Sequence, residues 1–215
     1  MSPAKPRKAS KTSKRRPRPT KRDESAPDDK AKPGKWRRRL RRLIVALVAI
    51  ALIPVLLVPL FRYINPIGTY ILYSRLVDGP LDREWADFDS ISKSLVVSVM
   101  MSEDARFCEH NGVDWGALRE VIDDPDGPSR GASTIAMQTV RNLFLWMSRS
   151  YIRKGLEIPL ALYADTVWGK RREMEIYLNI AQWGPELFGA EAAAQRYFGK
   201  PAANLSAGEA ALMAV

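Results

Sequence analysis

Two separated carboxylates and three cations are the residues of this chain whose types and spacing best suit chemistry. The carboxylates are Glu103 and Glu157, and the cations are Arg141, Arg153 and Lys154. They lie in three short segments in fixed order, SEDARFCEHNG, GASTIAMQTVRNLFL and RKGLE. A carboxylate can move a proton, and fixed cations can stabilise negative charge that develops on a leaving group. This set therefore suits chemistry on a large anionic substrate.

Glu103 is expected where a helix gives way to a loop, a position from which a rigidly held side chain can reach a cleft. Met100, Met101 and Phe107 flank it. Apolar surface around a carboxylate would suit proton transfer near neutral pH. A plainer interpretation is that Glu103 and Asp104 only form an exposed helix end.

Plainer interpretations also exist for the other polar residues. Arg153 and Glu157 are four residues apart and could form an exposed ion pair worth about 0.2–0.5 kcal/mol. A single histidine such as His110 is more often a hydrogen-bonded structural residue than a base, and Cys108 has the surroundings of a small packing residue. Because no His/Cys cluster has ligand spacing, a structural zinc site is not supported.

The elements that must position these residues are predicted to be helices. Ser90 can cap a helix with apolar residues at helical spacing that runs out at Glu103. Asp114 can cap a second helix, and Ser133 or Thr134 starts a third. The third helix should have one polar side, formed by Thr134, Gln138, Arg141 and Asn142.

A fourth helix would carry Arg153, Lys154 and Glu157, and Pro159 marks a kink or a break in it. Two further helical segments follow, KRREMEIYLNIAQWG and GAEAAAQRYFGK. Since no segment alternates between apolar and polar residues, a dominant sheet is not expected.

Residues 43–61, LIVALVAIALIPVLLVPLF, form an apolar run without a charge that is close to the roughly 20 residues needed to cross a membrane. A buried core helix and a cleavable signal peptide fit less well, because the run is apolar on all faces and no small-residue cleavage pattern follows. The preceding RRRLRR predicts, by the positive-inside rule, a cytoplasmic N-terminus and an external domain after Arg62.

The net charge of +10 belongs to the N-terminal tail and does not indicate a nucleic-acid-binding domain. Residues 1–42 hold 18 Lys/Arg against 4 Asp/Glu, a net charge of +14, which leaves 16 against 20, a net charge of −4, for residues 43–215. Six prolines and few apolar residues predict a disordered tail, so any nucleic-acid contact would be nonspecific. The predicted organisation is a basic cytoplasmic tail (1–42), a transmembrane helix (43–61) and an extracytoplasmic domain (62–215).

The three segments resemble the signature of the peptidoglycan glycosyltransferases, the family that includes the N-terminal domain of class A penicillin-binding proteins. Within it they are most similar to the monofunctional biosynthetic peptidoglycan transglycosylases. The family patterns E-D-x-x-F-x-x-H-x-G, G-x-S-T-I, R-K-x-x-E and Y-L-N are all met, and the resemblance runs from about Ile67 to the end. The matched residues are Glu103, Asp104, Phe107, His110, Gly112, Gly131, Ser133, Thr134, Ile135, Gln138, Asn142, Arg153, Lys154, Glu157, Tyr177, Leu178 and Asn179.

Two positions depart from the family pattern. Met137 replaces the first of two usual glutamines, and Arg141 replaces the usual lysine. Arg141 keeps the charge and adds a planar fork suited to phosphate. Relatives usually continue beyond the position of Val215, so a slightly truncated chain is expected.

The resemblance implies a mostly α, lysozyme-like helical domain that polymerises lipid II into β-1,4 glycan strands and releases undecaprenyl pyrophosphate. It implies that Glu103 is the general base and that Glu157 assists, through positioning or through a metal or water. The positions it implies for substrate binding are Asp104, Ser133, Thr134, Gln138, Arg141, Asn142, Arg153 and Lys154.

No cofactor is required by this chemistry, although a divalent cation such as magnesium is compatible with it. The implied partners are lipid II, the growing glycan chain, the membrane and cell-division or elongation proteins. The implied location is the inner membrane of a bacterium, spanned once, with the catalytic domain in the periplasm. An apolar patch near the bilayer is also expected, and its candidates are Leu143, Phe144, Leu145, Trp146 and Met147.

Three alternatives stay open at this point. A lysozyme-like hydrolase could use two carboxylates to cut glycan, but it would have no use for the cations. A bifunctional penicillin-binding protein would need a transpeptidase domain, and the S-x-x-K match from Ser90 to Lys93 lacks a K-T-G partner. The third alternative is a noncatalytic membrane-anchored scaffold.

Overall fold

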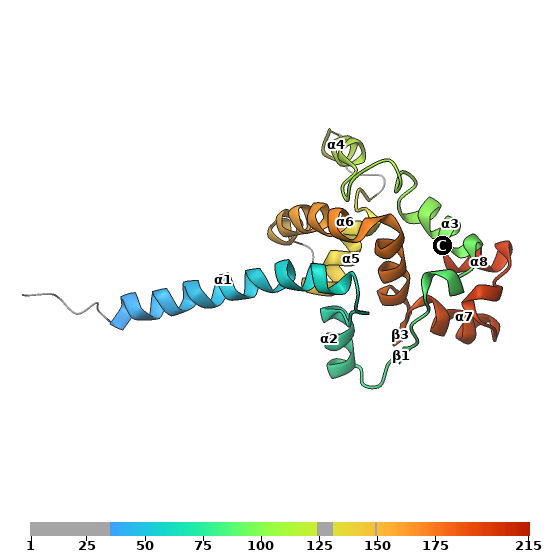
Figure 1. Ribbon diagram of the computed structural model, residues 1–215, viewed down its shortest axis with the longest axis horizontal. Helices are drawn as coiled ribbons and strands as arrows, with labels where there is room; N and C mark the ends of the chain where they lie inside the picture. The colour runs from blue at the N-terminus through green and yellow to red at the C-terminus, as the bar shows by residue number, and fades with distance from the viewer. Residues whose placement is uncertain (1–34, 124–130, 149) are drawn as a thin grey trace, which may run out of the picture. The chain divides into compact units, whose positions relative to one another are not determined.

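The computed structural model describes residues 35–123, 131–148 and 150–215 of the chain. This part is mostly helical, as predicted, with eight α-helices, two 3-10 helices and one small three-stranded sheet (Figure 1). In chain order the elements are α1 (Lys35–Phe61), α2 (Thr69–Val77), β1 (Asp82–Arg83), η1 (Phe88–Ser90), α3 (Lys93–Glu103), α4 (Trp115–Asp123), α5 (Ile135–Phe144), α6 (Tyr151–Ile180), β2 (Gln182–Gly184), β3 (Leu187–Phe188), α7 (Ala190–Phe198), η2 (Ala202–Asn204) and α8 (Ala207–Met213).

The chain divides into two units between Leu43 and Ile44, within α1. Most of the predicted tail, residues 1–34, lies outside the described residues. The helix begins at Lys35 and not at Leu43, because the arginine-rich segment before the apolar run is also helical. Over the described residues, α1 is the single helix that is long and apolar enough to cross a membrane.

The end of α1 contacts α6 through hydrogen bonds to backbone carbonyls of α1. The carbonyl of Val55 would normally accept from residue 59, but Pro59 has no N–H. The hydroxyl of Tyr163 donates to that carbonyl instead, at 3.0 Å. The indole of Trp168 likewise donates to the carbonyl of Val58, near the helix end, at 2.7 Å.

The cap of α3 differs from the prediction, whereas those of α4 and α5 agree with it. Ser90 ends η1, and the N-cap of α3 is Ser92, whose hydroxyl accepts from a backbone N–H of the first turn. The reason is that Ile91 between them is extended and turns into the core. Asp114 caps α4, and of the two candidates for α5 the structure uses Thr134.

The long helix α6 breaks at Gly169 and not at Pro159. Pro159 has no N–H, so the carbonyl of Gly155, four residues earlier, has no helical partner. Both residues are exposed, and water can therefore hydrate that carbonyl. Gly169 has φ 69° and ψ 163°, a conformation that essentially only glycine adopts.

The second half of α6 lies between two hydrophobic cores. Met174 and Leu178 pack with α3, α7 and α8, whereas Ile176 and Ile180 pack with α2, α5 and the end of α1. Helix α5 lies along α6, and α3 lies beside α8 (Figure 1). The small sheet has the order β1-β3-β2. The two predicted carboxylates therefore come from different elements, Glu103 from the end of α3 and Glu157 from the first half of α6.

Candidate active site

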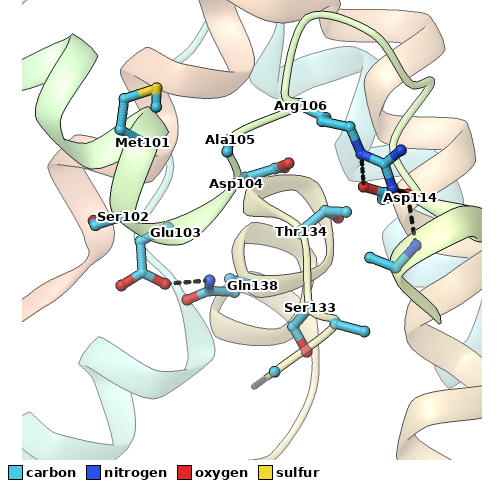
Figure 2. A pocket seen from close by; sticks show the side chains of 13 residues that line it. Met101, Ser102, Glu103, Asp104, Ala105, Arg106, Asp114, Ser133, Thr134 and Gln138 are labelled. Carbon is cyan, nitrogen blue, oxygen red and sulfur yellow. Dashed lines mark hydrogen bonds and ion pairs between the residues drawn. The ribbon is translucent and has the colours of Figure 1, made fainter. Parts of the chain in front are cut away.

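A cleft of about 480 Å³ opens at the end of α3 (Figure 2). It is lined by the loop after α3, the first turn of α4 and the segment that enters α5. Five of the predicted site residues line it, namely Glu103, Asp104, Ser133, Thr134 and Gln138. The cleft thus collects residues from two of the three sequence segments.

Glu103 is exposed at the cleft and is oriented by a side-chain amide. Its Oε2 accepts a hydrogen bond from Nε2 of Gln138 at 2.8 Å (Figure 2). The hydroxyl of Tyr177 reaches Oε1 of the same amide at 3.5 Å. Burial raises the pKa of Tyr177, and the charge of Glu103 raises it further, so the phenol stays a donor.

The apolar surroundings predicted for Glu103 are not found. Phe107 is buried in the core instead of covering the carboxylate, and Met101 is exposed beside it. Glu103 therefore faces water, because the helix ends there and the following backbone turns Phe107 inward.

Asp104 points into the protein and holds the loop in place. Its two oxygens lie 2.9 and 3.0 Å from Nε2 of His110, and Oδ2 accepts from the backbone N–H of Ile135 at 3.0 Å. A carboxylate at the first turn of α5 is also favoured by the helix dipole. His110 is therefore the structural histidine that was expected, while Cys108 is exposed and not packed.

Thr134 and Gly112 close the same loop onto α5 and α6. The hydroxyl of Thr134, which caps α5, donates to the carbonyl of Gly112 at 2.6 Å. Gly112 has φ 75°, and a Cβ there would lie 2.5 Å from the carbonyl oxygen of Ala161. Both residues thus shape the cleft, and their polar groups are turned toward the protein.

The ion pair of Arg153 and Glu157 is buried, contrary to the plainer interpretation of an exposed pair. Glu157 is 1% exposed, and its other oxygen lies 3.4 Å from Nζ of Lys154. Arg153 also donates through Nε to the carbonyl of Ser148 at 2.8 Å. A buried carboxylate between two cations is costly to leave unpaired, so Glu157 holds both cations in position.

Lys154 connects this buried pair to the cleft. Its Nζ donates to the hydroxyl of Ser133, a cleft residue, at 2.8 Å. Burial and, to a smaller extent, the charges of Arg141 and Arg153 together lower the pKa of Lys154 to about 8. Burial also lowers the pKa of Arg141, and electrostatic interactions with Tyr177 and Glu103 oppose that effect. An anion near Ser133 would relieve the mutual repulsion of these cations.

Asn142 lies apart from this group. It is buried, and its backbone carbonyl accepts from the hydroxyl of Thr69 at 3.4 Å. Gly68 lies so close that a Cβ there would be 2.6 Å from that carbonyl oxygen. The backbone of α5 at Asn142 therefore packs against the start of α2.

Sequence reasoning missed an ion pair on the far wall of the cleft. Arg106 donates through Nε and NH2 to both oxygens of Asp114, at 2.8 and 2.6 Å (Figure 2). Burial raises the pKa of Asp114, but the N–H of Ala117 and the guanidinium of Arg106 hold it below its usual value. Only the capping role of Asp114 was visible in the sequence, because a loop pairing eight residues apart has no periodic signal.

A divalent cation such as magnesium stays a prediction from the resemblance. Among residues 35–123, 131–148 and 150–215, no three His, Cys, Asp or Glu side chains cluster so that they could hold a metal ion. The carboxylate of Glu157 is already paired with two cations.

The candidates for an apolar patch separate into two groups. Leu143 is buried in the core, and Phe144 and Leu145 are partly buried, whereas Trp146 and Met147 are 45% and 41% exposed. Leu145, Trp146 and Met147 line a second hollow of about 440 Å³ together with residues of α2.

Known proteins are similar to this chain over most of its length. Residues 72–215 match the family model described as Transglycosylase. A protein of Agrobacterium fabrum (strain C58) named biosynthetic peptidoglycan transglycosylase is 52% identical over 184 residues, which cover 84% of this chain and 81% of the relative. A protein of Brucella suis biovar 1 with the same name is 51% identical over 184 residues, covering 84% of this chain and 82% of the relative. A third, from Rhizobium meliloti, is 50% identical over 184 residues, covering 84% and 78%.

Proposed function

Because this chain belongs to the transglycosylase family and is a peptidoglycan glycosyltransferase, we propose that Glu103 is the general base of its transfer reaction. The substrate is lipid II, the lipid-linked precursor that this family polymerises. The observation that carries the proposal is the orientation of Glu103 by Gln138 at the edge of a cleft in which Lys154 binds the wall residue Ser133.

In the proposed step, the 4-hydroxyl oxygen of the acceptor sugar attacks the anomeric carbon of the donor. The bond from that carbon to the pyrophosphate oxygen breaks, and the hydroxyl proton passes to Glu103. Undecaprenyl pyrophosphate leaves, and the linkage inverts from α to β-1,4. Glu103 is exposed in the free protein and so is accessible to a sugar hydroxyl, which would displace the water around it.

Lys154 and Arg141 are proposed to stabilise the leaving pyrophosphate. Lys154 already bonds a hydroxyl at the cleft wall, and Arg141 lies close enough to influence both Glu103 and Lys154 electrostatically. Fixed cations of this kind lower the barrier because they need no reorganisation when the charge develops. Glu157 and Arg153 act behind them as positioning residues, since both are buried.

A hydrolase would not need this arrangement. Hydrolysis of a glycosidic bond releases a sugar hydroxyl and no phosphate, so cations close to the cleft would have no developing charge to stabilise. The cations therefore favour a phosphate-bearing donor.

We further propose that α1 anchors the enzyme in the inner membrane with its N-terminus in the cytoplasm. Support comes from the apolar length of α1 and from the arginines at its start. Exposed Trp146 and Met147 are proposed to contact the lipid headgroup region, where indole rings are favoured. Recruitment by division or elongation proteins stays a prediction from the resemblance.

The test is incubation of the detergent-solubilised full chain with labelled lipid II, followed by sizing of the product. A polymer that disappears on lysozyme treatment is the expected result. Release of soluble fragments from cell walls without polymer formation would instead indicate the hydrolase, and inactivity in both assays would indicate the scaffold.

A further inference from the structure

The side chain of Met137 lies against the ammonium of Lys154. Its Sδ is 3.9 Å from Nζ, and Met137 is fully buried in the first turn of α5. An ammonium has three N–H donors, whereas a thioether is a weak acceptor. Ser133 Oγ at 2.8 Å and Glu157 Oε2 at 3.4 Å are the stronger partners of the same ammonium.

The charges that face Lys154 come from both helices packed around it. Arg141 lies on α5, and Arg153 and Glu157 lie on α6. Glu157 is the one counter-charge among these three, and it is shared with Arg153. On the side of Met137, therefore, the ammonium meets a polarisable but poorly solvating group.

We propose that Met137 is a positioning residue that acts through Lys154. Its thioether occupies the side of the ammonium that faces the protein interior and offers only a weak acceptor there. The strong hydrogen bond of Lys154 is therefore directed to Ser133 at the cleft wall. The consequence for catalysis rests on the proposed function, in which Lys154 meets the leaving pyrophosphate. The lowered pKa of Lys154, about 8, agrees with this poorly solvated environment.

Replacement by glutamine tests this directly, because glutamine has nearly the length of methionine but carries a strong carbonyl acceptor. In Met137→Gln that oxygen would accept from Nζ, solvate the charge and compete with Ser133. Lys154 should then hold its proton to a higher pH. In Met137→Leu, an apolar neighbour of similar volume, Lys154 should titrate at the same pH as in wild type or lower.

The experiment is competitive labelling of amines in the detergent-solubilised full chain between about pH 6 and 11, with mass spectrometry of the Lys154 peptide. We expect the labelling midpoint of Lys154 to rise by about one pH unit in Met137→Gln. Exposed Lys93 is the internal reference and should label alike in all variants. Met174→Gln is the matched control, since Met174 is 1% exposed in the other core.

An unchanged midpoint in folded Met137→Gln, or an equal shift in Met174→Gln, would overturn the proposal. If Met137→Gln does not fold, Met137→Ala replaces it: water entering the vacated space should also raise the midpoint, and an unchanged midpoint there overturns the proposal equally.

A second measurement separates this proposal from the function on which it rests. The alkaline limb of the pH profile for lipid II polymerisation should move upward in Met137→Gln together with the labelling midpoint. If the labelling midpoint of Lys154 rises in Met137→Gln but the alkaline limb of the polymerisation pH profile stays in place, the proposed role of Met137 in catalysis is overturned. If the midpoint is shifted in Met137→Gln but the wild-type protein does not polymerise lipid II, the proposed function is overturned while the contact of Met137 with Lys154 stays supported.

Discussion

At the scale of single residues, the site separates groups that face the cleft from groups that hold it together. Glu103 and Gln138 face the cleft, whereas Asp104 and Thr134 use their polar atoms on the protein itself. Substitutions in the first group should change the rate with little effect on stability. Substitutions in the second group should change both.

Glu103→Gln should lower the polymerisation rate by about 100-fold or more, because an amide of the same shape cannot take up the proton. The melting temperature should stay nearly unchanged, since Glu103 is exposed and bonds Gln138 alone among its described neighbours. Glu109→Gln, an exposed glutamate of the same loop, is the control and should keep wild-type activity. A folded Glu103→Gln protein that keeps more than about a tenth of the wild-type rate would mean that another group is the base.

The three cations should not behave alike. Arg141→Gln and Lys154→Gln should each weaken substrate use by about 1.5–3 kcal/mol, the scale of a hydrogen bond to a charged group. The melting temperature should stay nearly constant in Arg141→Gln. It should fall in Lys154→Gln and Arg153→Gln, because each of these leaves the buried Glu157 with one cation fewer. Lipid II kinetics and thermal melts on the same samples check this, and wild-type kinetics for Arg141→Gln and Lys154→Gln would argue against phosphate binding.

At the scale of elements, the break in α6 carries a buried acidic pair that the proposed mechanism does not use. Asp165 lies before Gly169 and Glu173 after it, and both carboxyl groups are buried. Lys170 pairs with Asp165 at 2.6 Å and lies 4.5 Å from the ring of Phe107. Through Lys170, this group of Asp165, Lys170 and Glu173 at the break in α6 contacts the loop that follows Glu103.

Burial, together with a smaller contribution from a hydrogen bond with Asp165, raises the pKa of Glu173 to about 9. Between its usual pKa of about 4.5 and 9, the unfolded chain loses this proton while the folded chain keeps it, so stability falls as the pH rises. Glu173→Gln can donate to Asp165 without this penalty. Its melting temperature relative to wild type should therefore increase steadily from pH 5 to 9. Glu175→Gln on the same helix is the control, and a difference for Glu173→Gln that does not vary with pH would contradict the assignment.

At the scale of the whole molecule, the chain combines an apolar helix with a domain that acts on a lipid-linked substrate. The carbonyls of Val55 and Val58 accept hydrogen bonds from side chains of α6, so the C-terminal half of α1 and the catalytic domain are joined by specific contacts. With the membrane anchoring proposed above, this joint would keep the cleft close to a substrate and a product that carry lipid tails.

A reporter fused after Arg62 should be active only outside the cytoplasm, because the arginines that precede the apolar run oppose their own translocation. A matched fusion after Arg42 should be active only inside. The measurement compares the activity of alkaline phosphatase, which is active outside the cytoplasm, with that of a reporter active inside it, each fused at both positions. Activity of the Arg62 fusion on the cytoplasmic side would reverse the orientation and remove access to external lipid II.

The sequence alone determined the properties that depend on a few neighbouring residues. The caps Asp114 and Thr134, the end of α3 at Glu103 and the apolar character of residues 43–61 could all be predicted, because capping and hydrophobic runs are local. The family signature added the expected chemistry of Glu103 through its order of motifs.

Only the tertiary structure decided which of these residues meet. The burial of Glu157, the contact of Lys154 with Ser133 and Met137, and the inward turn of Asp104 join residues from different segments. Such contacts follow from how α5 packs along α6, and no local pattern encodes that packing. For the same reason the break in α6 could not be assigned to Gly169: a proline in a helix is a visible local signal, but its cost depends on whether the freed carbonyl can be hydrated, which is a property of the fold.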